Sequence, residues 1–496
     1  MLLRLSKNMI LKNFQSVQKT LGLLLMVFSS SMLLPFLVAG LFNDVYTASS
    51  FLASFFFTLF SGLIIWYPSR KTTGELRLHE GFIIVSMFWV ILALFGCIPF
   101  LMLPESTLTL TDAIFESTSG LTTTGATVIT NLDSLPKGLL FYRAQLQWLG
   151  GLGIIVLAVA VLPMLGVGGM HLYKAESAAS VTESKLTPRQ KETARSLTII
   201  YVVLTVLCAL GYLLGGMSFF DAVCHAMTTV AIGGFSTHDA NFGFFQGSSF
   251  IYWVSSIFML LAGINFSLHF FAWKNKALST YLANSEFKAY IVLLLTVVFI
   301  AGISLMVNQT QTQSPATFTE LFFQVVSIGT TTGYTTAGYG YWPVFIPFLL
   351  LLVSFVGGCV GSTGGGLKVA RCLILLKQGL REAKRLVHPS AEIAVKINSK
   401  AVDQKILDSV WGFISAYVVI LVVFTLTLLA CGLDELTAFS AVTASLNNLG
   451  PGLGEVFVNY TDLSLLPKWV CIAAMVLGRL EIFALLVLFT PTFWQD

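Results

Sequence analysis

Four short segments of the chain share one pattern of small, hydroxyl-bearing and glycine residues. Each begins with Asp, Glu or Thr and reaches a glycine thirteen positions later. The segments run from Asp112 to Gly125, from Asp221 to Gly234, from Glu320 to Gly333 and from Thr437 to Gly450. The first and third share the sequence Thr-Thr-Thr-Gly. Backbone carbonyls and Thr hydroxyls supply oxygen atoms, which can replace the water shell of a small cation.

The glycine that ends each segment accepts a positive φ at little cost, so that successive carbonyls can point the same way. Four such strands around one axis would form stacked rings of oxygen atoms. The residues predicted to form these strands are Thr122, Thr123, Thr124 and Gly125; Ala231, Ile232, Gly233 and Gly234; Thr331, Thr332, Gly333 and Tyr334; and Asn448, Leu449 and Gly450. Ile232 and Leu449 stand where the first strand has Thr hydroxyls, so we expect fewer well-formed coordination sites than in four identical strands.

The composition places these segments in a membrane protein. The 496 residues are 56% hydrophobic and 10% charged, whereas a soluble chain carries about 25% charged residues. The net charge of +4 is too small to suggest nucleic-acid binding. Lys and Arg concentrate in alternate connections, which predicts that both ends of the chain lie in the cytoplasm. Ten apolar stretches are expected to span the bilayer, near 20–42, 51–67, 81–103, 139–165, 196–217, 249–273, 288–307, 343–377, 408–432 and 465–490.

The four patterned segments are too short to span. A helix of about ten residues is about 15 Å long, half the thickness of the hydrocarbon core, so each segment must re-enter the side it came from. The prediction is an all-α polytopic protein with ten transmembrane helices and four re-entrant pore helices, in a fourfold pseudo-repeat of span, pore loop and span around one axial pore. The predicted boundaries are 1–70 for two extra spans and 71–170, 171–275, 276–385 and 386–496 for the four repeats. The alternative is that Thr and Gly only mediate helix packing.

The eighth stretch contains six glycines in ten residues, between Gly357 and Gly366. Each costs a helix about 1 kcal/mol relative to Ala, so we expect a broken helix whose irregular part lines the pore and obstructs it. The residues assigned to this gate are Gly357, Gly358, Gly361, Ser362, Thr363, Gly364, Gly365, Gly366 and Arg479. A phosphate-binding loop is disfavoured because Leu367 precedes Lys368 and no Ser or Thr follows. A glycine face that packs against a neighbouring span is the plainer alternative.

Arg479 lies inside the last predicted span. An Arg near the bilayer centre costs at least about 2.5 kcal/mol on insertion scales, so it should face the pore or a carboxylate. Asp112 and Glu116 are possible partners. The hypothesis is that Arg479 raises an electrostatic barrier beneath the predicted strands, and the alternative is a structural ion pair.

The sequence resembles the Trk, Ktr and HKT superfamily of potassium transporters, and is most similar to bacterial Trk-type uptake subunits. The resemblance rests on 122–126, 231–239, 330–334, 447–451, 357–368 and the pair Gly478-Arg479. It implies K⁺ uptake across the bacterial cytoplasmic (inner) membrane, K⁺ bound in a selectivity filter, a homodimer with one pore per subunit, and a cytoplasmic ring of nucleotide-binding regulatory subunits. The basic segments 171–195 and 379–407 are the expected surface for that regulator or for anionic membrane lipid.

Three function classes are weighed. The first is a gated, selective pore for K⁺, with a less selective or Na⁺-coupled cation transporter as its variant; passive flux and symport with H⁺ or Na⁺ both stay open. The second is a secondary transporter of another solute, which would need inverted repeats, whereas the four segments all enter from one side. The third is a membrane enzyme, which is not expected because no nucleophile–base pair or metal-ligand spacing is found.

Overall fold

The computed structural model describes residues 2–72, 78–103, 108–160, 190–308, 317–336, 339–398 and 400–494. The fold is helical, as predicted, and its long helices carry apolar residues over lengths that suit a bilayer. Within these described ranges, six helices are long and apolar enough to cross a membrane, or eight if each of two bent pairs counts as one span. The end of the fourth predicted span, 161–165, and the basic segment 171–189 lie outside the described residues.

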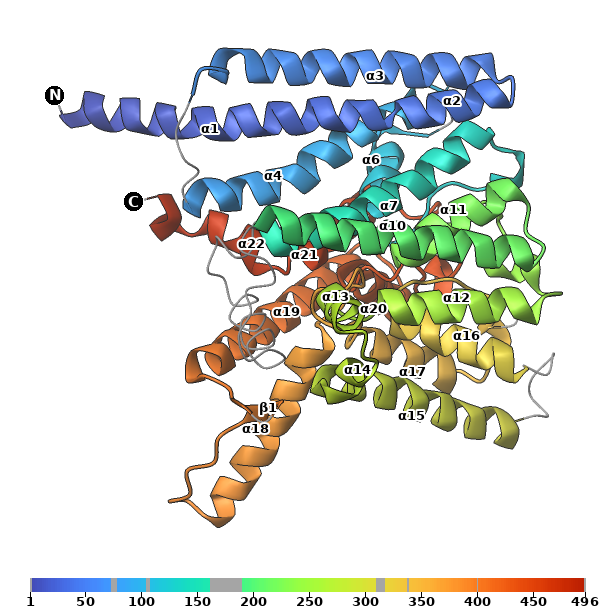
Figure 1. Cartoon of the computed structure of the whole chain (residues 1–496), viewed down its shortest axis with the longest axis vertical. Helices are drawn as coiled ribbons and strands as arrows, with labels where there is room; N and C mark the ends of the chain where they lie inside the picture. The colour runs from blue at the N-terminus through green and yellow to red at the C-terminus, as the bar shows by residue number, and fades with distance from the viewer. Residues whose placement is uncertain are drawn as a thin grey trace.

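Two hydrophobic helices precede the repeats. Helix α1 (Leu2–Ser31) continues after a short break into α2 (Leu33–Leu41), and α3 (Val45–Trp66) runs back along α1 to a turn of 3-10 helix, η1 (Tyr67–Ser69). Figure 1 shows this pair side by side at one edge of the molecule. It packs against the first repeat through α4 and α7.

The remaining elements follow the order of span, short helix and span four times. The first repeat has α4 (Leu78–Gly96), α5 (Ile98–Leu101), α6 (Leu110–Leu121), η2 (Leu132–Ser134) and α7 (Lys137–Ala160). The second has α10 (Gln190–Leu214), α11 (Phe219–Val230), η3 (Asn241–Phe245), α12 (Ser249–Ala262), α13 (Phe266–Asn275) and α14 (Ser279–Ala283).

The third repeat has α15 (Ser285–Val307), α16 (Phe318–Gly329), η4 (Tyr339–Tyr341), α17 (Phe345–Ser354) and α18 (Val369–Val387), followed by an antiparallel pair of two-residue strands, β1 (Lys396–Ile397) and β2 (Lys400–Ala401). The fourth has α19 (Gln404–Ala430), α20 (Glu435–Leu446), η5 (Gly454–Val456), α21 (Leu465–Arg479), α22 (Phe483–Leu486), η6 (Val487–Phe489) and η7 (Pro491–Trp494). In Figure 1, α18 extends away from the other helices.

The sequence predicts ten continuous or once-broken spans, and the structure differs at two of them. The sixth is bent by 93° between α12 and α13, and the tenth by 103° between α21 and α22. At the first bend Asn265 caps the new helix by accepting from Ser267 N. At the second, Glu481 and Ile482 both have positive φ. A 19-residue hydropathy window averages over such local breaks, so apolar composition alone does not show them.

Apolar cores join each repeat to its neighbours. The largest cluster combines α4, α6 and α7 of the first repeat with α20 and α21 of the fourth. Another combines the second repeat with Phe323 and Val326 of α16, and a third combines the third repeat with Ala444 and Leu449 of the fourth. Helix α7 packs against α11, which joins the first repeat to the second. The four repeats therefore close into a ring rather than a row.

Candidate ion pathway

Four buried half-helices start with the same kind of N-terminal cap. Helices α6, α11, α16 and α20 each have twelve residues. The capping side chains lie three residues before the aligned Asp, Glu or Thr of the sequence pattern, at Thr109, Ser218, Thr317 and Asp434. At Thr109 and Thr317 the acidic residue returns the bond to the cap, which makes a full capping box. The aligned residue is thus the third helical position, and each helix begins two residues earlier than the pattern suggests.

The four half-helices also end alike, in a Schellman motif. In the first, Thr123 N donates to Gly120 O at 3.0 Å and Thr124 N donates to Ser119 O at 2.8 Å. This 5→2 and 6→1 pair requires a left-handed residue just past the helix. That residue has φ between 52° and 69° in every repeat, and it is Thr123, Ile232, Thr331 or Asn448. Identical turns give the four strands the same starting direction.

The strands that follow form a closed ring at the glycine predicted from the pattern. All four glycines have φ between 81° and 96°. Each lies against the carbonyl oxygen that precedes the glycine of the next repeat, so that an added Cβ would fall within 2.7 Å of that oxygen or closer. Measured from the added Cβ, the distance is 2.1 Å from position 125 to Gly233 O, 2.1 Å from position 234 to Thr332 O, 2.0 Å from position 333 to Leu449 O and 2.7 Å from position 450 to Thr124 O. The four backbones therefore surround one common axis.

The Thr hydroxyls lie differently from the sequence expectation. Thr124 Oγ1 is 2.8 Å from Thr122 Oγ1, and Thr332 Oγ1 is 2.7 Å from Thr330 Oγ1. Each of these pairs joins two residues of one strand, and Thr124 Oγ1 also accepts from Asn448 Nδ2 of the fourth strand at 3.0 Å. At the left-handed position, by contrast, the Oγ1 atom of Thr123 and the Oδ1 atom of Asn448 are buried without a hydrogen-bond partner among the described residues.

A cavity of about 450 Å³ lies on one side of the ring, and all four glycines line it. Its wall also contains Arg143, His238 and Asp239. His238 Nδ1 is 2.5 Å from Asp133 Oδ1, and its other ring nitrogen is 3.5 Å from Asp221. The cavity therefore lies on the side of the ring toward which the chain continues after each glycine.

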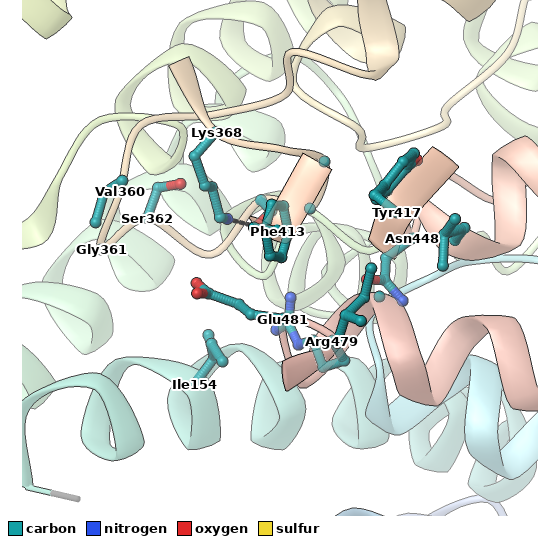
Figure 2. Close-up of a pocket in the computed structure, with 16 residues that line it drawn as sticks. Ile154, Val360, Gly361, Ser362, Lys368, Phe413, Tyr417, Asn448, Arg479 and Glu481 are labelled. Carbon is teal, nitrogen blue, oxygen red and sulfur yellow. Dashed lines mark hydrogen bonds between the residues drawn. The ribbon is translucent and has the colours of Figure 1, made fainter. Parts of the chain in front are cut away.

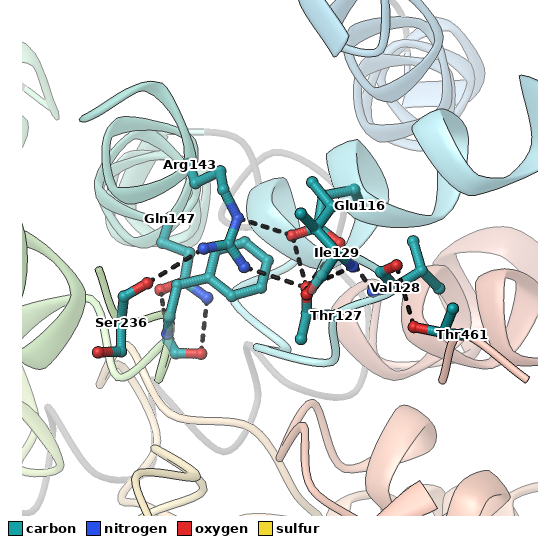
Figure 3. A network of polar contacts seen from close by, with 10 residues as sticks. Glu116, Thr127, Val128, Ile129, Arg143, Gln147, Ser236 and Thr461 are labelled. Atoms are coloured by element: carbon teal, nitrogen blue, oxygen red, sulfur yellow. Dashed lines mark hydrogen bonds and ion pairs between the residues drawn. The ribbon is translucent and has the colours of Figure 1, made fainter. Parts of the chain in front are cut away.

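A buried polar network holds the first two strands from behind, as Figure 3 shows. Arg143 Nε donates to Glu116 Oε1 at 2.8 Å, and the carboxylate of Glu116 accepts from Val128 N at 3.0 Å. Arg143 also donates to Thr127 Oγ1 and to Ser236 O, both at 3.1 Å. One Arg on α7 therefore ties the chain beyond the first strand to the chain beyond the second. Sequence reasoning missed this role because the partners lie up to 93 residues apart.

The position of Glu116 in α6 is used in the same way in two other half-helices. In α11 it is His225, whose Nε2 is 3.0 Å from Ser236 Oγ. In α16 it is Gln324, which donates to Tyr334 O and accepts from Thr336 N, both at 3.2 Å. His225 is therefore packed behind the second strand. A polar residue four positions after the acidic one was the available signal.

The glycine-rich segment is irregular, as predicted, and lies directly under the ring. Its base is closed by Leu367 N, which donates to Phe355 O at 2.7 Å. Gly366 N donates to Asn447 O at 3.1 Å, and Gly365 N donates to Thr331 Oγ1 at 2.7 Å. Thr363 Oγ1 reaches Val230 O at 3.0 Å. The segment thus contacts the inner ends of three of the four half-helices.

The same segment fills the bend in the sixth span. Cys359 N donates to Gly263 O at 2.9 Å, and Phe266 N donates to Gly361 O at 3.1 Å. Irregular backbone in the membrane needs such partners for its polar groups. The backbone polar groups at the bend between α12 and α13 and those of the glycine segment therefore serve as each other's hydrogen-bond partners.

Arg479 is 3% exposed and lines a cavity of about 50 Å³ under the ring. Figure 2 shows it there with Lys368, Glu481 and Asn448. Its Nη1 donates to Thr363 O at 3.0 Å and its Nη2 to Gly150 O at 3.2 Å. Arg479 is therefore bonded to the glycine segment itself.

The two carboxylates considered from the sequence as partners of Arg479 are engaged elsewhere. Glu116 pairs with Arg143, and Asp112 pairs with Lys468 at 2.8 Å. Glu481, two residues on from Arg479, pairs with Arg371. The suggestion of Asp112 or Glu116 is wrong because each already pairs with another basic residue, Lys468 or Arg143.

Comparison with known proteins settles the family. The profile of TrkH, described as a cation transport protein, matches residues 47–496. The chain belongs to the TrkH family. The Trk system potassium uptake protein TrkH of Escherichia coli K12 is 49% identical over 484 residues, which is 98% of this chain and 100% of that protein. The Trk system potassium uptake protein TrkG of the same organism is 40% identical over 475 residues, which is 96% of this chain and 97% of TrkG.

A solved structure of the TrkH family has the same fold. The crystal structure of the potassium transporter TrkH from Vibrio parahaemolyticus matches with a TM-score of 0.90 and 49% sequence identity. The match covers 97% of this chain and 100% of that one. The resemblance inferred from the sequence is confirmed.

Proposed function

We propose that this TrkH-family protein takes up K⁺ across the bacterial inner membrane through a pore on the axis of its glycine ring. One observation carries the proposal: the four glycines and the four preceding carbonyls contact one another in cyclic order. Rings of backbone carbonyls are the means by which proteins bind dehydrated K⁺. The family and the names of the relatives support K⁺ as the ion. In this proposal K⁺ is the transported substrate.

The filter consists of the strands predicted from the sequence, and its inner end includes side chains. Thr123 Oγ1 and Asn448 Oδ1 are buried oxygen atoms without a protein partner among the described residues. Buried polar groups are nearly always satisfied, so an ion or water at this level would satisfy them. The filter then offers backbone oxygens near the outer cavity and a mixed set of oxygens at its inner end.

The glycine segment from 357 to 366 acts as the gate, and Arg479 acts with it. The segment contacts the ends of three half-helices, which supports a position across the pathway. Arg479 adds a positive charge under the filter and bonds to the segment through Thr363 O. Arg479 has no carboxylate partner in the described part of the chain, and a cationic group at that place opposes the passage of a cation until the segment moves.

Ion flux in proteoliposomes tests both roles. The purified protein should pass Rb⁺ down an imposed voltage, and K⁺ should compete with Rb⁺ far better than Na⁺ does. Flux that follows a pH or Na⁺ gradient at zero voltage would favour symport over passive conduction. A variant shortened within 357–366 that still elutes as a folded protein should show a higher basal flux. Equal competition by Na⁺ and K⁺ would contradict the filter, and unchanged basal flux would contradict the gate.

The protein is also proposed to act as a homodimer with a soluble nucleotide-binding regulatory subunit on its cytoplasmic side. Helix α18 supports a docking surface there because Lys377, Lys384 and Arg385 accompany Leu376 and Leu380, which are 69% and 64% exposed. Light scattering of the purified protein measures the first proposal. Co-purification with a candidate regulator, in the presence and absence of anionic lipid, measures the second.

A further inference from the structure

The second filter strand lacks the side chains that support the first and third. In strand one, Thr122 Oγ1 bonds both Thr124 Oγ1 and Thr118 O of the half-helix, at 2.8 and 2.7 Å. In strand three, Thr330 does the same with Thr332 and Val326 O. The corresponding pair in strand two is Ala231 and Gly233, which have no hydroxyl. Another group must hold this strand.

Gln147 of α7 occupies that place. Its Nε2 donates to Gly233 O at 2.6 Å, and its Oε1 accepts from Phe235 N at 3.1 Å. The amide thereby brackets Gly234 from both sides, and Figure 3 shows the side chain directed at this strand. Gln147 is fully buried. Both polar atoms of the Gln147 side chain are thus hydrogen-bonded to the backbone of strand two.

The identity of Gly233 follows from the same contact. A Cβ at Gly233 would lie 2.3 Å from Gln147 Oε1 and 2.4 Å from its Cδ. Gly233 has an ordinary φ, so the glycine is not required by its backbone conformation. The amide of Gln147 occupies the space where the other strands carry Thr or Leu, so a side chain at position 233 would have to displace it.

We infer that Gln147 is a positioning residue for cation selectivity, which replaces the missing Thr–Thr pair of the second strand from a neighbouring helix. Arg143, one helical turn earlier on α7, holds Ser236 O of the same strand at 3.1 Å. The second span of the first repeat therefore supports the filter strand of the second repeat. The inference rests on the proposal that Gly233 O lines the K⁺ path.

The bond also affects the oxygen itself. A carbonyl oxygen has two lone pairs, and Gln147 uses one, which leaves the other for an ion. A carbonyl held in this way moves inward toward a smaller ion less readily, because the movement weakens the bond to Gln147. Loss of the amide should therefore favour Na⁺ at this level, and it should change the ion preference more than the total flux.

The test measures Rb⁺ flux and its competition by Na⁺ in proteoliposomes of the full-length protein. Gln147→Met keeps the length of the side chain and removes both bonds. The preference for K⁺ over Na⁺ should fall about three- to tenfold, the range that corresponds to the one hydrogen bond on Gly233 O. Gln145→Met is the control, because Gln145 is equally buried on α7 but donates to Ser31 O, away from the filter. Unchanged preference in Gln147→Met, with the wild type selective, overturns the inference. A wild type without preference would instead overturn the proposed filter.

A double-mutant cycle tests whether a side chain at position 233 and the amide of Gln147 compete for the same space. Gly233→Ala should lower the preference because its Cβ meets the Gln147 amide. Gln147→Ala makes room for that Cβ, so the double variant should be no worse than Gln147→Ala alone. Independent effects that multiply in the double variant would overturn the inference. Elution profile and thermal unfolding of each variant show that the comparison is between folded proteins.

Discussion

The carboxylate of Glu286 accepts a hydrogen bond from the backbone N–H of Val360, 2.8 Å away. The same oxygen accepts from Ala370 N at 3.2 Å. One buried side chain from the first turn of α15 thus holds both the glycine segment and the start of α18. The preceding residue, Ser285, exchanges hydrogen bonds with Asn398 in the turn between β1 and β2. Neighbouring residues therefore connect the β1–β2 turn to the proposed gate.

Replacing Glu286 with Ala should raise the basal Rb⁺ flux. Without the carboxylate, two buried N–H groups lose their acceptor, at a cost of about 1–3 kcal/mol each, and the closed position of the segment becomes less favourable. Glu286→Gln keeps one acceptor oxygen and should give an intermediate flux. The exposed Glu392 provides the control variant, Glu392→Ala. A basal flux equal to that of the wild type would show that this contact does not hold the gate.

Replacing Gly333 with Ser should lower the preference for K⁺ over Na⁺. Its φ is 82°, and a Cβ would lie 2.0 Å from Leu449 O, so the strand or its neighbour must shift. Gly432→Ser is a matched control, because Gly432 has φ 91° but no atom within 4 Å of an added Cβ. Both variants carry the left-handed strain of about 1–2 kcal/mol. Competition assays that give the same ion preference for both variants would contradict the filter assignment.

Neutralising Arg479 should raise the flux. A unit charge about 8 Å from a cation contributes about 2 kcal/mol at an effective dielectric constant of about 20, so Arg479→Gln should increase the Rb⁺ rate about tenfold or more. Arg479→Lys keeps the charge and should stay near the wild-type rate. If Lys raised the rate as much as Gln, the bonds to Thr363 O and Gly150 O, and not the charge, would be the relevant contribution.

The stability of the outer mouth should depend on pH through His238. Burial lowers the pKa of His238, but the nearby carboxylates of Asp221 and Asp133, the second of which is hydrogen-bonded to the ring, raise it more, so the pKa lies above the ordinary 6.5. A raised pKa gives stability that is complete below about pH 6.5 and is lost as pH rises through the folded-state value. The Tm in detergent should fall over that range.

His238→Gln should remove this part of the pH dependence. The effect of Asp133 is separate, because its lowered pKa acts only toward acid pH. A Tm profile above pH 6 that is the same for the variant and the wild type would show that the His238 contacts contribute no net stability there.

The repeated parts of the fold could be predicted from the sequence, and the parts between repeats could not. Four aligned glycines and the spans around them follow from composition and spacing, and the structure places these glycines in contact. The break at 357–366 follows from the helix propensity of glycine. The bend at Gly263–Asn265 could not be predicted, because the N–H group that bonds to Gly263 O belongs to Cys359, almost a hundred residues later.

The supporting residues were missed for the same reason. Arg143 and Gln147 sit four positions apart on α7, which predicts only a shared polar face. Their partners, Glu116 and Gly233, come from two different repeats. In a single sequence, a buried Arg or Gln in an apolar helix signals that a polar partner exists, but not which one.

Closure of the ring has a consequence for biosynthesis. The last contact joins Gly450 to the Thr124 carbonyl, and Tyr460 N also reaches Thr127 O at 2.8 Å. The first strand therefore gains its contact with the fourth strand only after nearly the whole polypeptide has been synthesised. A chain that is terminated before Gly450 lacks the contact that closes the ring, so the arrangement of all four strands depends on complete translation.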